Sequence, residues 1–150
     1  MPDKQTLQRA KKDKREGKAA STQAGEFVRE EIEHIREGKH GARSAKQAIA
    51  IGLSKARRAG VDLPPPKKGT TSERTRRSAA TAYRAGRRSD VKVSAARSHA
   101  AKEALKDEGH AAASSTALAR HARAAAKDKT AAQRSAAARK AARTRAKTGR

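Results

Sequence analysis

Residues 24–61 read AGEFVREEIEHIREGKHGARSAKQAIAIGLSKARRAGV and hold eight of the 14 Ile, Leu, Val and Phe residues in the chain. In the first part of this stretch, the apolar residues recur every three, four or seven positions, which is the spacing of one helix face, and Gly38 provides a stop. A capping box at Ser44 and Gln47 starts a second helix, and Gly60 followed by prolines ends it. The stretch predicts a helical hairpin over about residues 24–61.

The hairpin carries the only group of large apolar residues that could form a core. We expect that core to consist of Phe27, Val28, Ile32, Ile35, Ile49 and Leu53. The first helix is rich in Glu and the second ends in basic residues, so their pairing lowers the repulsion within this cationic chain. A unit of about 40 residues rarely folds without a staple or a partner. The sequence therefore predicts marginal stability, with a homodimer through the hairpin as one way to complete the fold.

Outside the hairpin, composition sets the expectation. The chain has 150 residues, with 38 Lys and Arg against 15 Asp and Glu, and a formal net charge of +23. Ile, Leu, Val and Phe fill about a tenth of it, whereas highly charged chains below about 20% are typically disordered. From Lys67 onward there are 23 basic and 6 acidic residues, against 15 and 9 before it. The fold class expected is mostly α, a short helical hairpin followed by a largely disordered or nascent-helical basic tail.

The same features divide the chain into four regions. We expect a basic disordered arm in residues 1–20, the helical hairpin in 21–63, a Pro-rich linker in 64–69 and an Ala/Lys/Arg-rich tail in 70–150. Capping residues near 70–73, at Asp90, at Ser115 and at Thr130 mark four helical stretches in the tail. Short helices without tertiary packing are marginal in water, and like charges on neighbouring turns weaken them. The tail is thus expected to form transient helices that become ordered on contact with phosphates.

Two segments resemble known families. Residues 136–145, AAARKAARTR, resemble the Ala/Lys/Arg-rich tails of linker histones and of bacterial histone-like nucleoid proteins, a likeness of composition that extends over roughly residues 67–150. Residues 46–54, KQAIAIGLS, are similar to the core of a small uncharacterised domain found in basic bacterial proteins. The first resemblance implies a nucleoid-associated protein. The second favours a bacterial origin and implies no activity. We expect a cytoplasmic protein, because the charged N-terminus shows no secretory signal.

The surplus of cations points to nucleic acid as the partner. Each Lys or Arg placed against a phosphate releases condensed counterions, and the guanidinium fork can bind phosphate oxygens bidentately. We expect sequence-nonspecific binding, to DNA more than to RNA, that condenses or coats the nucleoid. The residues expected to contact nucleic acid are Lys39, His40, Arg43, Lys46, Arg57, Arg58, Arg76, Arg77, Arg87, Arg88, Arg120, Arg123, Arg134, Arg139, Lys140, Arg143, Arg145 and Lys147.

Several alternatives stay open from the residues alone. The hairpin could dock on another protein while the tail binds RNA, the ribosome or an acidic protein. The turn at residues 38–43, with its cations, could hold a phosphate at the N-terminus of the second helix. That helix could also read bases through Ala45, Lys46 and Gln47, as in a helix-turn-helix. Tyr83 could stack on a base or pack on a partner.

Other function classes have little support in the sequence. There is no Cys for a disulfide or a thiolate metal site. The longest apolar run spans only residues 48–51, so no membrane association is expected. The histidines, His34, His40, His99, His110 and His121, show no ligand spacing, and His34 is expected to be a solvated surface residue. We predict no metal, no cofactor, no small-molecule substrate and no enzymatic activity, because no nucleophile has a positioned base.

Overall fold

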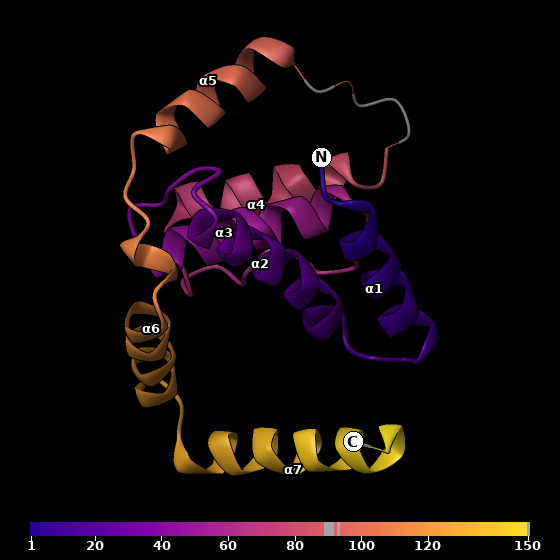
Figure 1. The fold of residues 1–150 in the computed structure, drawn as a ribbon. Helices are drawn as coiled ribbons and strands as arrows, with labels where there is room; N and C mark the ends of the chain where they lie inside the picture. Colours follow the sequence, from indigo (N-terminus) through magenta and orange to yellow (C-terminus); the bar gives the residue numbers. More distant parts are fainter. Residues whose placement is uncertain (89–91, 93, 150) are drawn as a thin grey trace. The chain divides into compact units, whose positions relative to one another are not determined.

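The computed structural model of the protein describes residues 1–88, 92 and 94–149, and every regular element within them is helical (Figure 1). The helices are α1 (Lys4–Arg15), α2 (Ala20–Arg36), α3 (Ala45–Arg58), α4 (Glu73–Ala85), α5 (Ala95–Lys106), the 3₁₀ helix η1 (Ala111–Ala113), α6 (Ser115–Lys127) and α7 (Ala131–Thr148). The chain divides into two compact units, Met1–Ser114 and Ser115–Arg150. The boundary therefore follows η1, well after the prolines at which the composition changes.

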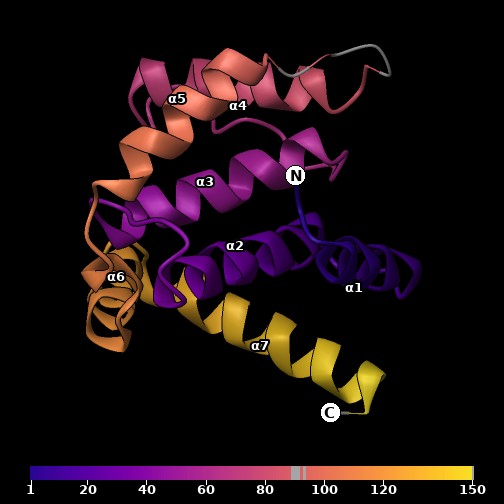
Figure 2. The same cartoon turned by 45° about the horizontal axis from the view of Figure 1, so that its top comes forward.

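The first unit is built around the pairing of α2 with α3. Its α2 packs against both α1 and α3, and α4 packs on α3 (Figure 2). Of the residues expected to form the hairpin core, Phe27, Ile32 and Ile35 are buried. The other three, Val28, Ile49 and Leu53, are partly buried. Much of the remaining core is alanine, including the fully buried Ala24, Ala48 and Ala56.

Small residues let α2 and α3 approach closely. A β-carbon placed on Gly52 of α3 would lie 2.6 Å from the Cα atom of Val28 on α2, so no larger residue fits there. The close approach brings many backbone and alanine atoms into van der Waals contact, which offsets the scarcity of long aliphatic side chains. The end of α3 follows the expected pattern, because Gly60 has φ +89 and the Val61 N–H donates to the Ala56 carbonyl at 3.1 Å.

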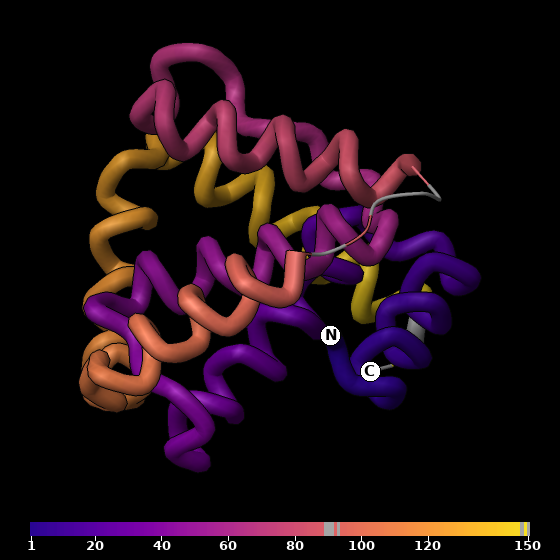
Figure 3. The backbone as a smooth tube through the Cα atoms, turned by 90° about the horizontal axis from the view of Figure 1, so that it is seen from above, coloured from indigo at the N-terminus to yellow at the C-terminus, as the bar shows by residue number. Residues whose placement is uncertain are grey.

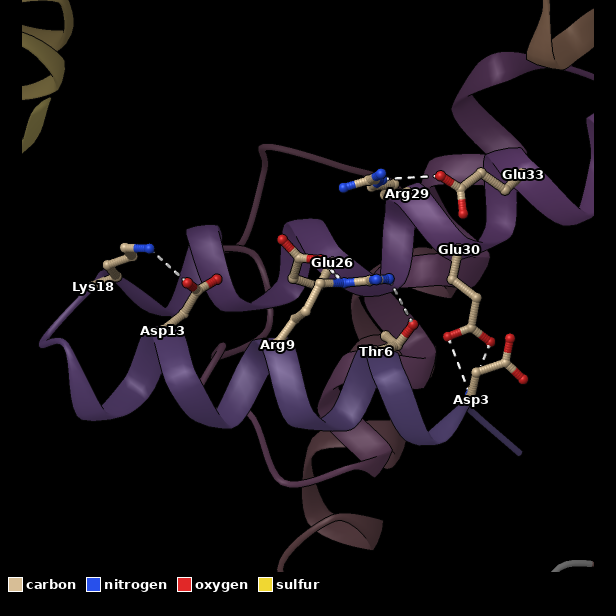
Figure 4. A network of polar contacts seen from close by, with 9 residues as sticks. All are labelled: Asp3, Thr6, Arg9, Asp13, Lys18, Glu26, Arg29, Glu30 and Glu33. Atoms are coloured by element: carbon tan, nitrogen blue, oxygen red, sulfur yellow. Dashed lines mark hydrogen bonds and ion pairs between the residues drawn. The ribbon is translucent and has the colours of Figure 1, made fainter. Parts of the chain in front are cut away.

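Residues 1–20 are not a disordered arm, and that expectation is wrong. They form α1, which lies along α2 and buries Thr6, Ala10 and Asp13, residues that recur every three or four positions on one helix face. Arg9 reaches across to α2, where its Nε atom is 2.6 Å from Glu26 Oε2 (Figure 4). Lys18 closes the turn after α1 through an ion pair with Asp13 at 2.7 Å. The buried face of α1 is small and polar, which is why apolar periodicity does not reveal it.

The residues after the prolines are also ordered within the described ranges. Ser72 caps α4 by accepting from the Thr75 N–H at 3.2 Å, and Ala79 and Ala82 are buried in the contact with α3. The next helix, α5, starts after Ser94 and buries no residue. Its C-terminal end joins the turn between α2 and α3, where the Leu105 carbonyl accepts from the Gly41 N–H at 2.7 Å (Figure 3). The helix start expected at Asp90 lies outside the described residues.

The second unit consists of α6 and α7, which begin where the capping signals at Ser115 and Thr130 place them. Thr130 and Gln133 form a complete capping box at the start of α7. Arg134 links the two helices, since its Nη1 atom donates to the Lys129 carbonyl at 2.6 Å and the Ala126 carbonyl at 3.3 Å.

The expectation of a short hairpin followed by a largely disordered or nascent-helical tail, and with it of an intrinsically disordered protein, is therefore wrong. In α7, 18 residues that include eight alanines are longer than the roughly 12–15 at which isolated helices are marginal. In α4, the residues buried in the contact with α3 are two alanines. Neither feature depends on the large apolar residues from which disorder was inferred.

The contact at Gly52 gives a test of the fold. Replacing Gly52 with Ala should lower the free energy of unfolding by about 1–3 kcal/mol, because the added methyl group has no space against Val28. The matched control is Gly25→Ala on α2, where a β-carbon would meet nothing within 4 Å. That change should raise the free energy of unfolding by about 0.5–1 kcal/mol through helix propensity. Urea unfolding followed by circular dichroism measures both, and equal effects at the two sites would contradict the close packing.

Candidate functional site

The clearest basic surface is on the second unit. Residues 115–150 contain 11 Lys and Arg and a single acidic residue, Asp128. Every residue of α7 from 131 to 147 is exposed. Arg139, Arg143 and Lys147 follow one another at four-residue spacing, and Lys140 lies beside them, so the four share one side of the helix. None of these four side chains has an ion pair or a hydrogen bond with any residue that the structure describes. We call them the α7 basic face.

Several cations expected to contact nucleic acid are engaged within the first unit instead. Most of them face a carboxylate: the pairs are Lys39 with Glu37 at 2.9 Å, His40 with Glu31 at 3.1 Å, Arg43 with Glu108 at 3.4 Å, Arg76 with Glu73 at 3.0 Å, and Arg87 with Asp62. By contrast, Lys46, Arg58 and Arg77 are exposed and make no such contact in the described part of the chain. Arg120 and Arg123, on α6, are exposed in the same way. Arg88 and Arg145 are exposed as well.

Arg57 and Arg58 are neighbours in sequence with different surroundings. Arg57 is buried, and its Nε atom donates to the Leu63 carbonyl at 3.0 Å, which holds the segment after α3 against the helix. Burial lowers the pKa of the Arg57 guanidinium. Arg58 points to solvent. Of the two, only Arg58 is accessible to a nucleic acid.

Tyr83 packs within its own chain. The Arg87 guanidinium carbon lies 3.5 Å from the centre of the tyrosine ring, a cation–π contact. The tyrosine hydroxyl donates to Asp62 Oδ1 at 2.7 Å, so α4 is tied to the segment that follows α3. The hydrogen bond from Tyr83, followed by that from Arg87, lowers the pKa of the Asp62 carboxyl. The face of the ring that Arg87 covers is not available for a base.

The turn between α2 and α3 is not an open phosphate site. Its Gly41 N–H donates to the Leu105 carbonyl at 2.7 Å, and its Ala42 N–H donates to the Gly109 carbonyl at 3.0 Å. The Arg43 N–H donates to Gln47 Oε1 at 2.7 Å. Since each cation of the turn also faces a carboxylate, the groups expected to bind phosphate are already occupied.

The structure also argues against base reading by the start of α3. Ser44 caps the helix as expected, accepting from the Gln47 N–H at 3.2 Å, although the Gln47 side chain bonds to Arg43 and not to Ser44. Ala45 is buried and Gln47 is partly buried. Only Lys46 of the three expected readers is exposed. A recognition helix needs several exposed side chains at this position.

A cluster of buried carboxylates and histidines on the first unit does not follow from the sequence reasoning. Glu31 is buried between His40, whose Nε2 atom is 3.1 Å from Oε1, and Lys55, whose Nζ atom is 2.6 Å from Oε2. Next to it, Glu30 is buried and accepts from the Asp3 N–H, at the start of α1, with both oxygens at 3.3 Å (Figure 4).

Two histidines complete this cluster. The His34 side chain is 15% exposed, and its Nε2 atom lies 3.5 Å from Asp3 Oδ2 and 4.0 Å from Glu30 Oε1. The ring centres of His34 and His40 are 6.2 Å apart, with the planes nearly perpendicular. The expectation that His34 is a solvated surface residue is therefore wrong. The available signal was the spacing of His34 from Glu30 and Glu31, four and three residues along one helix. We call Asp3, Glu30, Glu31, His34 and His40 the Glu/His cluster.

Comparison with known proteins relates only the first part of the chain to a family. Residues 4–68 match a family described as Family of unknown function (DUF6496). The match covers α1, α2, α3 and all of the Glu/His cluster except Asp3, and the second unit lies outside it. No curated protein and no solved structure matches the chain. Among the described residues, no helix has both the length and the apolar content needed to cross a bilayer.

Arg57 and Arg58 give a matched pair for testing burial. Replacing Arg57 with Gln should lower the free energy of unfolding by about 1–3 kcal/mol, because the partly buried Leu63 carbonyl loses a charged donor. Replacing Arg58 with Gln, which removes the same charge at the surface, should change it by less than about 0.5 kcal/mol. Thermal and urea unfolding measure both values. Equal losses in the two variants would show that the lost charge, and not the loss of the Arg57 contact with Leu63, lowers the stability.

The contact between Tyr83 and Asp62 predicts a pH effect. Because the pKa of Asp62 is lowered in the folded protein, its stabilising contribution is present at neutral pH and is lost as the pH falls through that lowered value. In Tyr83→Phe, the pKa of Asp62 should rise toward its ordinary value, since the hydrogen bond that lowers it most is gone. Carbon-detected NMR titration of the aspartate carboxyls in the wild type and the variant measures this shift. An unchanged pKa of Asp62 would refute the hydrogen bond.

Proposed function

We propose that this protein binds nucleic acid, DNA in particular, through the phosphate backbone and without sequence preference, with the second unit as the principal contact. The observation that carries the proposal is the α7 basic face, which is exposed and has no carboxylate counter-charge among the described residues. In a cell this activity would place the protein on the nucleoid. There, contacts from both units would let it coat or condense DNA.

The dimensions of α7 suit this partner. From Arg139 to Lys147 the helix rises by about 12 Å. Over the same length of axis, duplex DNA offers roughly seven phosphates, because it carries one charge per about 1.7 Å. The duplex therefore offers more phosphates along this length than the four cations on this side of α7. Nothing in such an interface requires contact with base edges, so sequence preference should be slight.

The first unit is suited to a supporting part in this binding. Exposed cations such as Lys46, Arg58 and Arg77 add to the attraction, but many of its basic groups are paired with its own carboxylates. The rival proposal, in which the hairpin docks on a partner protein, has less support. The side chains it would use include Ile32 and Ile35, which are buried within the unit. The same burial disfavours a homodimer through the hairpin core.

The salt dependence of binding tests this proposal. Replacing Arg139, Lys140, Arg143 and Lys147 with Gln should weaken binding to all duplex sequences alike. The slope of log K against log salt should become shallower by up to about 3.6, since each lost phosphate contact contributes about 0.9. Fluorescence anisotropy with two duplexes of unrelated sequence, measured between 50 and 200 mM salt, gives both quantities.

The control variant has the same change in net charge in the other unit. It replaces Lys4, Lys11, Lys67 and Lys68, all exposed, with Gln. Its slope should change by much less than that of the α7 variant. If the two variants lose affinity equally, the binding follows total charge and α7 is not the contact surface. A loss confined to one duplex would indicate base reading.

A further inference from the structure

We propose that the first unit binds one divalent transition-metal ion of the zinc class at the Glu/His cluster, with Glu31, His34 and His40 as ligands. The proposal is independent of nucleic-acid binding, because it rests on a different unit and on charges of the opposite sign. The cluster joins three parts of the fold: α2, the turn before α3, and the residue that precedes α1.

The donor atoms are close enough to share one ion. One carboxylate oxygen of Glu31 and one ring nitrogen each of His34 and His40 lie within 4.8 Å of one another. A tetrahedral zinc ion with ligands at about 2.0–2.1 Å holds its donor atoms roughly 3.3 Å apart. Glu31 Oε1 and His40 Nε2 are already 3.1 Å apart. Small rotations of side chains would bring the third donor to the same spacing.

The environment of Glu31 points to a second cation, at Oε1, in addition to Lys55. The residue is almost completely buried, and neither of its carboxylate oxygens accepts a hydrogen bond of normal geometry from the described residues. Lys55 forms an ion pair with Oε2 at 2.6 Å, which leaves Oε1 directed at His40. A buried carboxylate is costly without strong compensation, and coordination of a metal is one of the ways proteins supply it.

The tautomer of His40 supports coordination through Nε2. Its Nδ1 atom lies 3.0 Å from the Gly41 carbonyl oxygen, which can only accept, so Nδ1 carries the hydrogen. In the neutral ring, the lone pair of Nε2 then points toward Glu31 Oε1, which is 3.1 Å away. Two lone pairs repel each other at this distance unless a positive charge lies between them. Either an added proton or a metal ion provides it. Metal-binding histidines commonly donate their other N–H to a backbone carbonyl in this way.

The local charge distinguishes this place from the rest of the protein. Three carboxylates, Asp3, Glu30 and Glu31, lie together here in a chain whose formal net charge is +23. Two lysines are near them: Lys55 pairs with Glu31, and Lys39 interacts electrostatically with Asp3 and Glu30. Asp3 and Glu30 border His34 and add negative charge beside the proposed ligands. Two imidazoles with a carboxylate suit zinc and its neighbours better than magnesium, which prefers oxygen ligands.

The test uses the full-length chain without an affinity tag, stripped of metal by a chelator. Titration with Zn²⁺ in competition with a chromogenic chelator should show one tight site per chain. Glu31→Gln, His34→Gln and His40→Gln should each weaken that affinity by more than about 100-fold, beyond the 10–100-fold typical of residues that only orient ligands. The control variant replaces His99, His110 and His121 with Gln together and should bind Zn²⁺ like the wild type.

Two further measurements keep the result interpretable. Circular dichroism and urea unfolding without metal show whether each variant is folded, and the unaltered chain loaded with Co²⁺ should give the visible absorption of a tetrahedral site with nitrogen and oxygen ligands. A Co²⁺ spectrum like that of the ion in water would overturn the proposal. So would Zn²⁺ binding that is equal in wild type and His40→Gln, or that is lost in the three-histidine control. If the wild type binds no Zn²⁺, the cluster is a buried ion network only.

Discussion

The close contact of α2 with α3 is the constraint on which the rest of the first unit depends. With few long aliphatic side chains, the chain obtains its packing contacts by bringing helices together over glycine and alanine. Once Gly52 lies against Val28, Phe27 is buried against Ala56 and Val61, and the outer faces of the pair accept α1 and α4. The same pairing sets the turn before α3 beside α2, which places His40 against Glu31.

The sequence was sufficient to predict the elements whose signals are local. The hairpin follows from the spacing of Phe27, Ile32 and Ile35, and the helix starts follow from capping residues such as Ser44 and Thr130. The contacts made by small or polar residues could not be predicted. Thr6 and Asp13 are polar, so a search for apolar periodicity does not identify the buried face to which they belong. Alanine occurs both in the core and on exposed helices of this protein, so its presence does not indicate burial. Treating alanine as weak packing material led to the incorrect expectation of disorder.

The candidate sites show the same division. Composition identified the surplus of cations, but it could not separate Arg57, which is buried against a carbonyl, from Arg58, which is exposed. The structure shows that most acidic groups of the first unit form ion pairs with basic residues of the same unit. The second unit has a single acidic residue, so most of its cations have no such partner nearby in sequence. The Glu/His cluster depends on a residue before α1 and another in the turn before α3, so no short motif describes it.

We propose that the two units have different roles. The first is held together by a core of small residues, and the second presents the surface that binds the phosphates of DNA. Hydrogen–deuterium exchange of the full-length chain, with and without duplex DNA, tests this division most directly. We expect slow exchange in α2 and α3 under both conditions, and DNA-dependent protection concentrated in residues 115–149. Protection centred on α2 and α3, with none in α6 and α7, would contradict it.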